Sequence, residues 1–535
     1  MLNGQIFHRK IKAQFKNIRQ NFFPDKNCKE FIQHCHKNWD EWKVKEPSSV
    51  LLIDIFPDSQ YILLASYFAN ILSRKHNSKI VGFATSRLWG SRAFRYIYAS
   101  FNMAQIVWPR LSDRIKKSYY SDVTKAWEQI NTKQDLLDFT YEGIWVGIDI
   151  YESYLRAGRP TVNLKDPEVF KLFTRAIELV RFWKTYFDRN EVSSVIVCHD
   201  CYLEHHALVK VAYANNVPVY VPNLTYPVYT DKPFTYYSFV KKYHDYFSLL
   251  NKKEQDEGLQ IGKELLEERL GINSTAKNST ERTTFNGEIK KHRILTESNK
   301  LKVLICTHCF FDQPHSYYRL PFVDFYEWLE YLGRVSRETD YDWYIKVHLD
   351  PMPGTMDVIN AFLLSYPHIK LIQDDSNPYQ LAREGLNFIL TIHGTVGHEY
   401  PALGVQVLNA GFNPHIAYDF NWHARSLQEY EHYLRNLHTL SKQIRIEEMY
   451  EFYFVHYRLC RIDDIIFPSY FDYCQTVPWY ELGSSNSFHA FITQFSQERH
   501  KNIIARIGEF IDSKRHHMFE LNFKNNHVSV HAEDG

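Results

Sequence analysis

The chain has 535 residues, of which 44% are hydrophobic and 16% are aromatic. This composition supplies enough apolar side chains for large buried cores, which excludes a globally disordered protein, and the length predicts about two to four domains. Lys and Arg together number 63 and Asp and Glu number 62, for a formal net charge of +1. This balance gives no electrostatic argument for a nucleic-acid partner, and none is expected.

No stretch of about 18 apolar residues occurs in the sequence, so we expect no membrane-spanning helix. Residues 1–23 are basic and aromatic but lack the apolar core of a signal peptide, which predicts a cytoplasmic protein. This stretch is compatible with a peripheral contact to the inner face of the cytoplasmic membrane and equally with a solvated first helix. The eight cysteines are expected to be reduced. The sequence makes no prediction of the oligomeric state.

The first half of the chain changes from a polar start to an alternation of apolar strands and helices. Residues 1–47 are predicted to form a helical extension. Short apolar runs joined by helical segments then predict a Rossmann-like domain over residues 48–245. Its expected elements are strands at 49–55, 79–85, 193–197 and 217–223 and helices at 61–74 and 206–216.

The second half repeats this alternation after a charged, Ser/Thr/Asn-rich stretch. Residues 246–299 are predicted to be a polar linker whose first part is a surface helix. A second Rossmann-like domain is predicted over residues 300–424, and residues 425–535 are expected to be helical. The elements expected in the second domain are strands at 302–308, 342–348, 369–372, 387–393 and 405–411 and helices at 322–339, 356–367, 377–385 and from 394.

These patterns predict an α/β fold in which two Rossmann-like domains face a cleft. Open parallel sheets bind ligands beyond the carboxyl ends of their strands. Two domains with these ends facing each other can hold a donor on one side of the cleft and an acceptor on the other.

Polar residues at the expected strand ends of the second domain are candidates for binding an anionic donor. Lys346 and His348 can both donate hydrogen bonds to phosphate oxygens. The turn after the strand at 387–393 contains His393, Gly394 and Thr395, and Glu399 follows in the first turn of a helix. A helix N-terminus with free N–H groups favours phosphate. The alternative is structural: a surface lysine, and a capping box formed by Thr395 and Glu399.

The first domain is expected to supply the base that removes a proton from the acceptor hydroxyl. Candidates at predicted strand ends are Asp54, Asp149 and the loop that contains His199, Asp200 and His205; we favour that loop, with Asp200, His199 and Asp149 as the catalytic candidates. The structural alternatives are that Asp200 is a helix N-cap and that Asp149 forms an ion pair with Arg156. His308, Asp312 and His315 occupy the first strand–helix loop of the second domain and are expected to face the cleft.

Two C-x-x-C pairs are candidate zinc ligands. Cys198 and Cys201 follow a strand of the first domain, and Cys306 and Cys309 follow a strand of the second, 105 residues or more apart in the sequence. Zinc knuckles normally lie in short, loop-rich units, so we expect these cysteines to be strand-end residues and predict no metal.

Several stretches resemble the capsule polysaccharide biosynthesis glycosyltransferases, a bacterial family that includes Kdo transferases of the GT-B fold. They span about residues 140–415 and include YESYLRAGRPTVN, VIVCHDCYLEHHALVKVAYANNVPVYV, LICTHCFFDQPH, FYEWLEY, WYIKVHLDP and IHGTVGHEYPALGVQVLNAG. Leu349 stands where the family usually has proline. The resemblance implies a nucleotide-sugar donor, often a CMP-activated acid sugar, bound without metal by the C-terminal domain, with His348 and Thr395 at its phosphate and Glu399 nearby. It also implies a polysaccharide or glycolipid acceptor and no separate cofactor.

Three other functions stay open from the sequence. A sugar-nucleotide epimerase has the same two-domain architecture but needs acid and base carboxylates inside the donor cleft. A transferase of a CDP-linked phospho-alcohol would use the same phosphate-binding residues. A glycan-binding scaffold with a decayed site is the non-enzymatic alternative.

Overall fold

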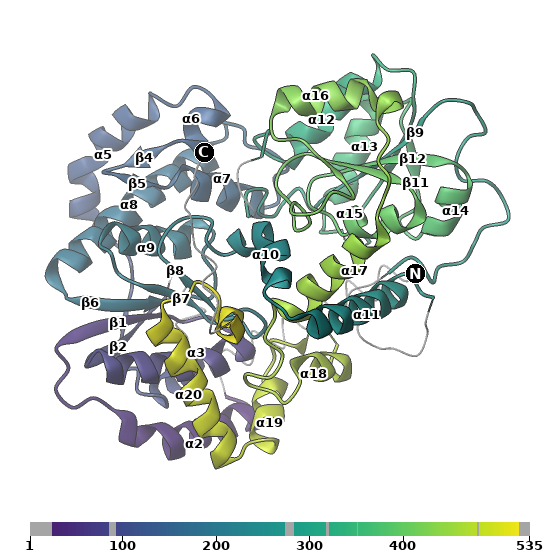
Figure 1. Ribbon diagram of the computed structural model, residues 1–535. Helices are drawn as coiled ribbons and strands as arrows, with labels where there is room; N and C mark the ends of the chain where they lie inside the picture. Colours follow the sequence, from purple (N-terminus) through teal and green to yellow (C-terminus); the bar gives the residue numbers. More distant parts are fainter. Residues whose placement is uncertain are drawn as a thin grey trace.

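The computed structural model describes residues 24–84, 92–272, 283–316, 320–349, 351–478 and 481–523. The basic stretch 1–23, for which a membrane contact was considered, lies outside these residues. Two α/β lobes lie side by side, with α10 (Tyr243–Ser248), α11 (Lys252–Arg269) and α17 (Ile446–Phe454) between them (Figure 1). Across the part of the chain that is described, no helix is both long and apolar enough to cross a membrane.

The N-terminal lobe contains a six-stranded sheet in the order β3-β2-β1-β6-β7-β8. Its strands are parallel except for the antiparallel pair of β7 and β8. They are β1 (Ser49–Asp54), β2 (Ser78–Phe83), β3 (Gln105–Val107), β6 (Val192–Ile196), β7 (Val219–Val221) and β8 (Val228–Thr230). A short hairpin of β4 (Thr140–Tyr141) and β5 (Ile144–Trp145) precedes α7.

The C-terminal lobe repeats this topology, with the order β11-β10-β9-β12-β13-β14 and every pairing parallel. The strands are β9 (Lys302–Cys306), β10 (Asp342–Lys346), β11 (Lys370–Ile372), β12 (Leu386–Thr391), β13 (Gln406–Asn409) and β14 (Trp422–His423). In each sheet the first strand, β1 or β9, is central. The next two strands of the sheet are added on one side of it, and the chain then crosses to add the last three on the other side. The loops after β1 and β6, and after β9 and β12, therefore diverge and open a crevice at the carboxyl edge. The expected α/β fold with two Rossmann-like sheets is confirmed.

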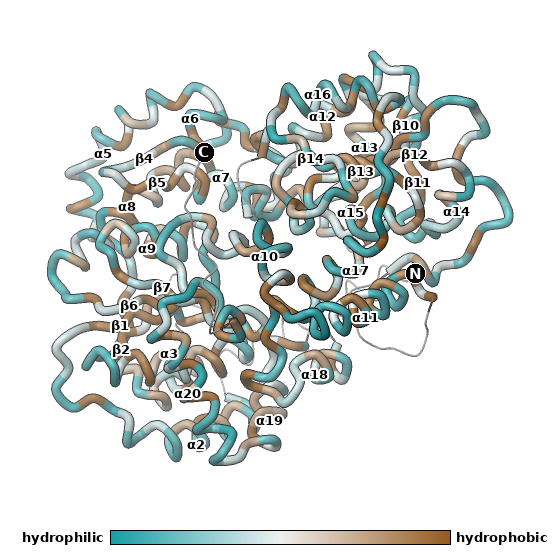
Figure 2. Tube along the Cα trace, in the orientation of Figure 1, coloured by the Kyte–Doolittle hydropathy of each residue, from teal (hydrophilic) through white to brown (hydrophobic). Residues whose placement is uncertain are grey.

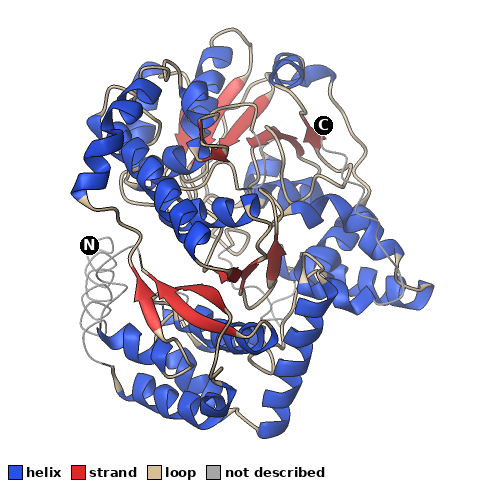
Figure 3. Cartoon of the chain, turned by 90° about the vertical axis from the view of Figure 1, so that its left-hand side faces the viewer, coloured by secondary structure: helices blue, strands red, loops and turns tan. Residues whose placement is uncertain are grey.

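Helices cover both faces of the sheets, and apolar residues concentrate along the strands (Figures 2 and 3). Those of the N-terminal lobe are α2 (Lys26–Trp39), α3 (Ser59–Lys75), α4 (Arg92–Ala99), α5 (Asp113–Trp127), α6 (Lys133–Leu137), α7 (Gly147–Arg156), α8 (Pro167–Arg189) and α9 (Leu203–Ala214). Those of the C-terminal lobe are α12 (Phe325–Ser336), α13 (Thr355–Ser365), α14 (Pro378–Arg383), α15 (Val396–Glu399) and α16 (Leu427–Arg435).

The end of the chain returns to the N-terminal lobe. The helices α18 (Tyr470–Thr476), α19 (Asn486–Thr493) and α20 (Gln497–Ser513) follow α17. Helix α19 packs on α2, and α20 packs on α3. Phe31 of α2 stacks on Phe488 of α19 with ring centroids 4.2 Å apart. The two ends of the described chain therefore share one hydrophobic core with the first sheet.

The stretch expected to be a polar linker contains a helix that is buried along one side. Helix α11 packs against α17, and its Gly258 and Gly262 face that helix so closely that a Cβ atom would collide with Phe454 and with the backbone of Tyr450. The close approach of the two helix backbones depends on Gly262, and Gly258 leaves room for the ring of Phe454. The charged residues that suggested a linker cover the solvent side of α11.

Three strands end two residues earlier than the sequence predicted, and this changes where three candidate histidines lie. Strands β9, β10 and β12 end at Cys306, Lys346 and Thr391, so the histidines at 308, 348 and 393 lie in loops beyond the sheet. The helix expected from residue 394 is a single turn, α15, followed by a 3-10 turn over Tyr400–Leu403. Pro401 has no N–H to donate, so the α-helical ladder does not continue.

Candidate functional site

A cavity of about 480 Å³ lies at the carboxyl edge of the C-terminal sheet, a size that suits a small-molecule ligand. Its lining comes from the ends of β9, β10 and β12, from α15 and from the end of α11. All six donor-binding candidates from the sequence line it: Lys346, His348, His393, Gly394, Thr395 and Glu399. His308 lines it too, together with Arg269, Thr391 and others that the sequence did not single out.

His308 joins the two strands on either side of the crevice. Its Nε2 atom accepts the backbone N–H groups of Ile392 and His393 at 3.1 and 3.3 Å, and lies 3.1 Å from Thr391 Oγ1. Burial lowers the pKa of His308 well below its usual value, so the ring is neutral. Because Nε2 accepts, the ring proton resides on Nδ1. The imidazole therefore shapes the turn that follows β12.

Lys346 is a buried lysine with 8% of its surface exposed. Its Nζ donates to the carbonyl of Ser376 at 3.4 Å, and among the described residues no carboxylate lies within 4.0 Å of it. Burial lowers the pKa of Lys346, while Cys306 and Glu399 act in the opposite direction. A lysine that lines a cavity without a carboxylate partner favours an anionic ligand.

Glu399 forms an ion pair with Arg269 and does not cap α15. The Nε atom of Arg269 donates to Glu399 Oε1 at 2.8 Å, and both residues are buried. The side chain of Thr395 makes no capping bond, so the capping box considered from the sequence is wrong. The reason is tertiary: the last residue of α11 reaches the first turn of α15 and takes the carboxylate. No local pattern pointed to Arg269, which is 130 residues away in the sequence.

The other donor candidates differ in their exposure. His393 is largely buried and burial lowers its pKa to about 4, so it is neutral at physiological pH. His348 is exposed at the rim of the cavity. At Gly394, a Cβ atom would lie 2.8 Å from Thr391 Oγ1, so the tight turn depends on the missing side chain.

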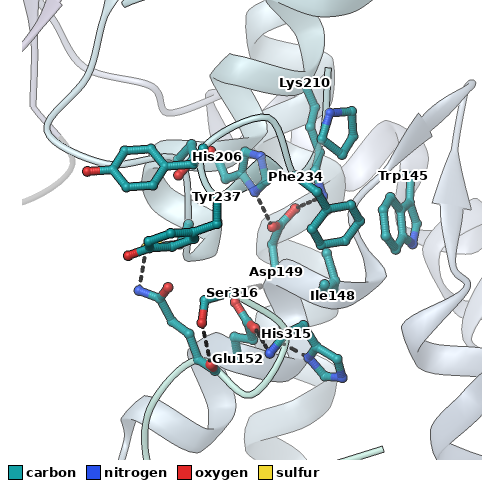
Figure 4. A pocket seen from close by; sticks show the side chains of 15 residues that line it. Trp145, Ile148, Asp149, Glu152, His206, Lys210, Phe234, Tyr237, His315 and Ser316 are labelled. Atoms are coloured by element: carbon teal, nitrogen blue, oxygen red, sulfur yellow. Dashed lines mark hydrogen bonds and ion pairs between the residues drawn. The ribbon is translucent and has the colours of Figure 1, made fainter. Parts of the chain in front are cut away.

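Asp149 lies at the centre of a buried charge cluster at the edge of the N-terminal sheet (Figure 4). His206 Nδ1 lies 2.7 Å from Asp149 Oδ1, and Lys210 Nζ lies 2.8 Å from Oδ2. Burial raises the pKa of Asp149, but Lys210 and His206 outweigh it and hold the pKa below its usual value. His206 and Lys210 were missed, although their i, i+4 spacing puts them on one face of α9.

The expected pairing of Asp149 with Arg156 is wrong. Asp149 lies in the first turn of α7 and not at a strand end, and Arg156 ends that helix about 10 Å further along the axis. Arg156 lies 3.6 Å from Asp312 instead.

The loop after β9 connects the two lobes. Asp312 accepts a hydrogen bond from Tyr202 at 2.5 Å. His315 Nδ1 lies 3.3 Å from Glu152 Oε1, and Figure 4 shows these two side chains together. Gln313 and His315 line a small cavity of about 40 Å³ together with Asp149, Asp200 and other residues of the N-terminal lobe. The loop therefore lies between the donor-candidate cavity and the charge cluster of the first lobe.

The loop after β6 holds the remaining candidates. Helix α9 begins at Leu203 with Tyr202 as its N-cap residue, so the interpretation of Asp200 as an N-cap is wrong. Burial raises the pKa of Asp200, and burial lowers the pKa of His199 to about 3. His205 is buried, with its Nδ1 atom 2.8 Å from Asp54 Oδ2.

A second cavity of about 460 Å³ adjoins the first, since Arg269 lines both. Tyr457, Arg458 and Arg461 line it from the end of α17, where the chain forms a π-helical turn over Val455–Leu459. Arg461 lies over the ring of Tyr457 at 5.0 Å. Such π-helical turns are frequent at functional sites. The sequence predicted only that residues 425–535 are helical.

All eight cysteines are free thiols in the structure. No protein-family model matches the chain, and no curated protein matches its sequence. Among solved structures, the Thermosulfurimonas dismutans KpsC beta Kdo 2,4 transferase is 15% identical, with 49% of this chain and 79% of that chain covered at a TM-score of 0.28. The S. aureus MnaA–UDP co-structure is 13% identical, with 76% and 91% covered at a TM-score of 0.22. The glycosyltransferase SnogD from Streptomyces nogalater is 10% identical, with 77% and 96% covered at a TM-score of 0.22.

Proposed function

We propose that the protein is a glycosyltransferase that moves a sugar from a nucleotide-sugar donor to a capsule or surface-polysaccharide acceptor. The observation that carries the proposal is Lys346, a buried cation without a carboxylate partner that lines a ligand-sized cavity at the crevice of a Rossmann-like sheet. The donor phosphate would supply the missing negative charge. His348 at the rim and the backbone N–H groups around Gly394 and Thr395 would complete the phosphate site.

In this proposal the C-terminal lobe stabilises the leaving group. As the glycosidic bond to the nucleotide breaks, negative charge grows on the departing phosphate, and Lys346 offsets it at short range in a partly buried site. No metal is needed for this step. His308 holds the turn that carries Gly394 and Thr395, which makes it a positioning residue. The donor proposed from the family resemblance is a CMP-activated acid sugar.

Asp200 is the base that we propose in the N-terminal lobe. Burial raises the pKa of the Asp200 carboxyl towards neutral pH. A general base is most effective when its pKa lies near the working pH. Asp149 is a poorer choice because Lys210 and His206 occupy both of its oxygens. His199, with its pKa near 3, binds a proton too weakly. The base would take the proton of the acceptor hydroxyl as that oxygen attacks the anomeric carbon.

One observation favours transfer over epimerisation. Among the described residues that line the donor cavity, Glu399 is the single carboxylate, and Arg269 holds it in an ion pair. An epimerase needs free acid and base groups inside that cavity. A phospho-alcohol transferase would use the same phosphate site, and product analysis separates it from a glycosyltransferase.

The experiment is nucleotide binding by the full chain, measured by thermal shift with CMP, CDP, UDP and GDP. We expect one of them to stabilise the protein by about 2.7 kcal/mol at a hundredfold excess over its dissociation constant. Lys346→Met should weaken binding about tenfold to a hundredfold, which corresponds to the loss of a charge-assisted hydrogen bond. Lys302→Met is the matched control, because this lysine is equally buried at the opposite edge of the same sheet.

Asp200→Asn tests the base. We expect it to lower kcat by about 10²- to 10⁴-fold while nucleotide binding is unchanged. Binding of no nucleotide by the wild-type protein would refute the donor site, and full activity of Asp200→Asn would refute the base.

A further inference from the structure

The crevice of the N-terminal sheet gathers a second set of side chains that the proposed transfer does not use. Cys198, His199 and His205 each offer one ligand atom, and these atoms all lie within 4.8 Å of one another. Asp54, at the end of β1, lies against them from the other side of the crevice. Asp54 is the last residue of β1, Cys198 and His199 lie in the loop that follows β6, and His205 lies in the first turn of α9. The adjacent strands β1 and β6 therefore bring the start of this group together at the carboxyl edge of the sheet.

We propose that these four side chains bind one zinc ion. Cysteine sulfur, imidazole nitrogen and carboxylate oxygen are the ligands that zinc takes in proteins, usually four in a tetrahedron. The two C-x-x-C pairs do not bind this ion together, because Cys198 is the one cysteine of the four in the proposed site. The set instead combines one cysteine of the first pair with two histidines and a distant aspartate.

The spacing of the ligand atoms supports a tetrahedral site. Asp54 Oδ2 lies 2.8 Å from His205 Nδ1 and 3.1 Å from Cys198 Sγ, and Cys198 Sγ lies 3.9 Å from His205 Nδ1. With zinc–ligand bonds of about 2.0–2.3 Å, the edges of a tetrahedron are roughly 3.3–3.6 Å long. These three separations bracket that length, and the ligand atom of His199 lies within 4.8 Å of those of Cys198 and His205. Side-chain rotations would bring the four ligand atoms around an ion.

An unsatisfied carboxylate oxygen is the second, independent observation. Asp54 is 0% exposed, and its Oδ1 atom has no hydrogen-bond partner. A buried carboxylate oxygen without a partner is costly, and a cation removes that cost. Two neutral imidazoles, one thiolate and one carboxylate would also balance the charge of a divalent ion, which suits a buried location.

The phenyl ring of Phe56 lies beside both histidines, with centroid distances of 5.8 Å to His199 and 6.2 Å to His205. Such an apolar neighbour limits the access of water to a metal site. The site lies in the other lobe from the donor cavity, so the inference does not rest on the proposed function.

The test is metal content of the full chain purified without chelator and dialysed against zinc. We expect about one equivalent of zinc per chain, as for a single four-ligand site. Cys198→Ser and Asp54→Asn should lose it, while Cys309→Ser, the matched change in the other C-x-x-C pair, should keep it. Equal zinc in Cys198→Ser and Cys309→Ser, or no bound zinc in the wild-type protein, would overturn the proposal.

A second measurement covers variants that fail to fold. Cobalt added to the wild-type protein should give a thiolate-to-cobalt charge-transfer band in the near ultraviolet, and zinc should displace it. Absence of that band would overturn the proposal. Nucleotide-induced thermal shifts measured on the same samples report the donor site separately, so failure of one proposal is distinguishable from failure of the other.

Discussion

Replacement of Lys210 by methionine tests how much the buried ion pair with Asp149 contributes to the free energy of unfolding. Lys210 and Asp149 form an ion pair at 2.8 Å, with 4% and 1% of their side chains exposed. The methionine keeps most of the lysine volume but leaves Asp149 as a buried carboxylate with only His206 beside it. Removal of one partner of a buried ion pair costs about 3–5 kcal/mol, so we expect the free energy of unfolding of the N-terminal lobe to fall by that amount at pH 7.

The pH dependence follows from the pKa of Asp149. In the wild-type protein this pKa lies below its usual value, so the stability that the carboxylate contributes is present above its unfolded pKa of about 3.9 and is lost as the pH falls through the lower folded pKa. In Lys210→Met, one of the two cations that offset the effect of burial is gone, so the folded pKa of Asp149 should rise relative to the wild-type protein. The destabilisation should then be greatest at neutral pH and should shrink as the pH falls through the raised pKa.

The assay is urea unfolding followed by circular dichroism at several pH values, for the two single variants Lys210→Met and Asp149→Asn and for the double variant. A double variant has no buried charge left in the pair, so it should recover about 3 kcal/mol relative to the sum of the single effects. A loss of stability below about 1 kcal/mol for Lys210→Met would be typical of a solvent-exposed ion pair and would refute this reasoning. An additive double variant would do the same.

Other predictions concern the helix contact and the buried arginine. Gly262→Ala should destabilise the protein by about 1–3 kcal/mol in thermal unfolding, because its Cβ would lie 1.8 Å from the carbonyl oxygen of Tyr450. Gly508→Ala is the control within helix α20: no atom lies within 4 Å of its Cβ position, so it should stabilise by up to about 1 kcal/mol. Glu399→Gln should cost about 3 kcal/mol, because it removes the negative charge that pairs with the buried guanidinium of Arg269, and urea unfolding measures this. Unchanged stability of this variant would show that water or another group compensates Arg269.

Local patterns were sufficient for much of the architecture. Apolar runs of five or six residues separated by amphipathic segments predicted the central strands of both sheets, because burial on two faces requires nearly continuous apolar sequence. They also placed Lys346 and His393 at or close to the ends of strands and Thr395 in the turn that follows β12. The length of each strand was less predictable. A strand ends where its backbone groups no longer hydrogen-bond to a neighbouring strand, and this depends on the neighbour as well as on the strand's own sequence.

The sequence by itself determined that two α/β units exist, where most of their strands and helices lie and which loops follow the carboxyl ends of the strands. Only the tertiary structure decided which side chains meet. Arg269 pairs with Glu399 across 130 positions, and Lys210 pairs with Asp149 across 61. The structural alternatives that the local sequence offered were a capping box of Thr395 and Glu399 and an ion pair of Asp149 with Arg156. The physical reason is that a buried charge requires the nearest available opposite charge in space. Spatial neighbours across a folded chain are set by the order of strands and the packing of helices, which no local pattern records.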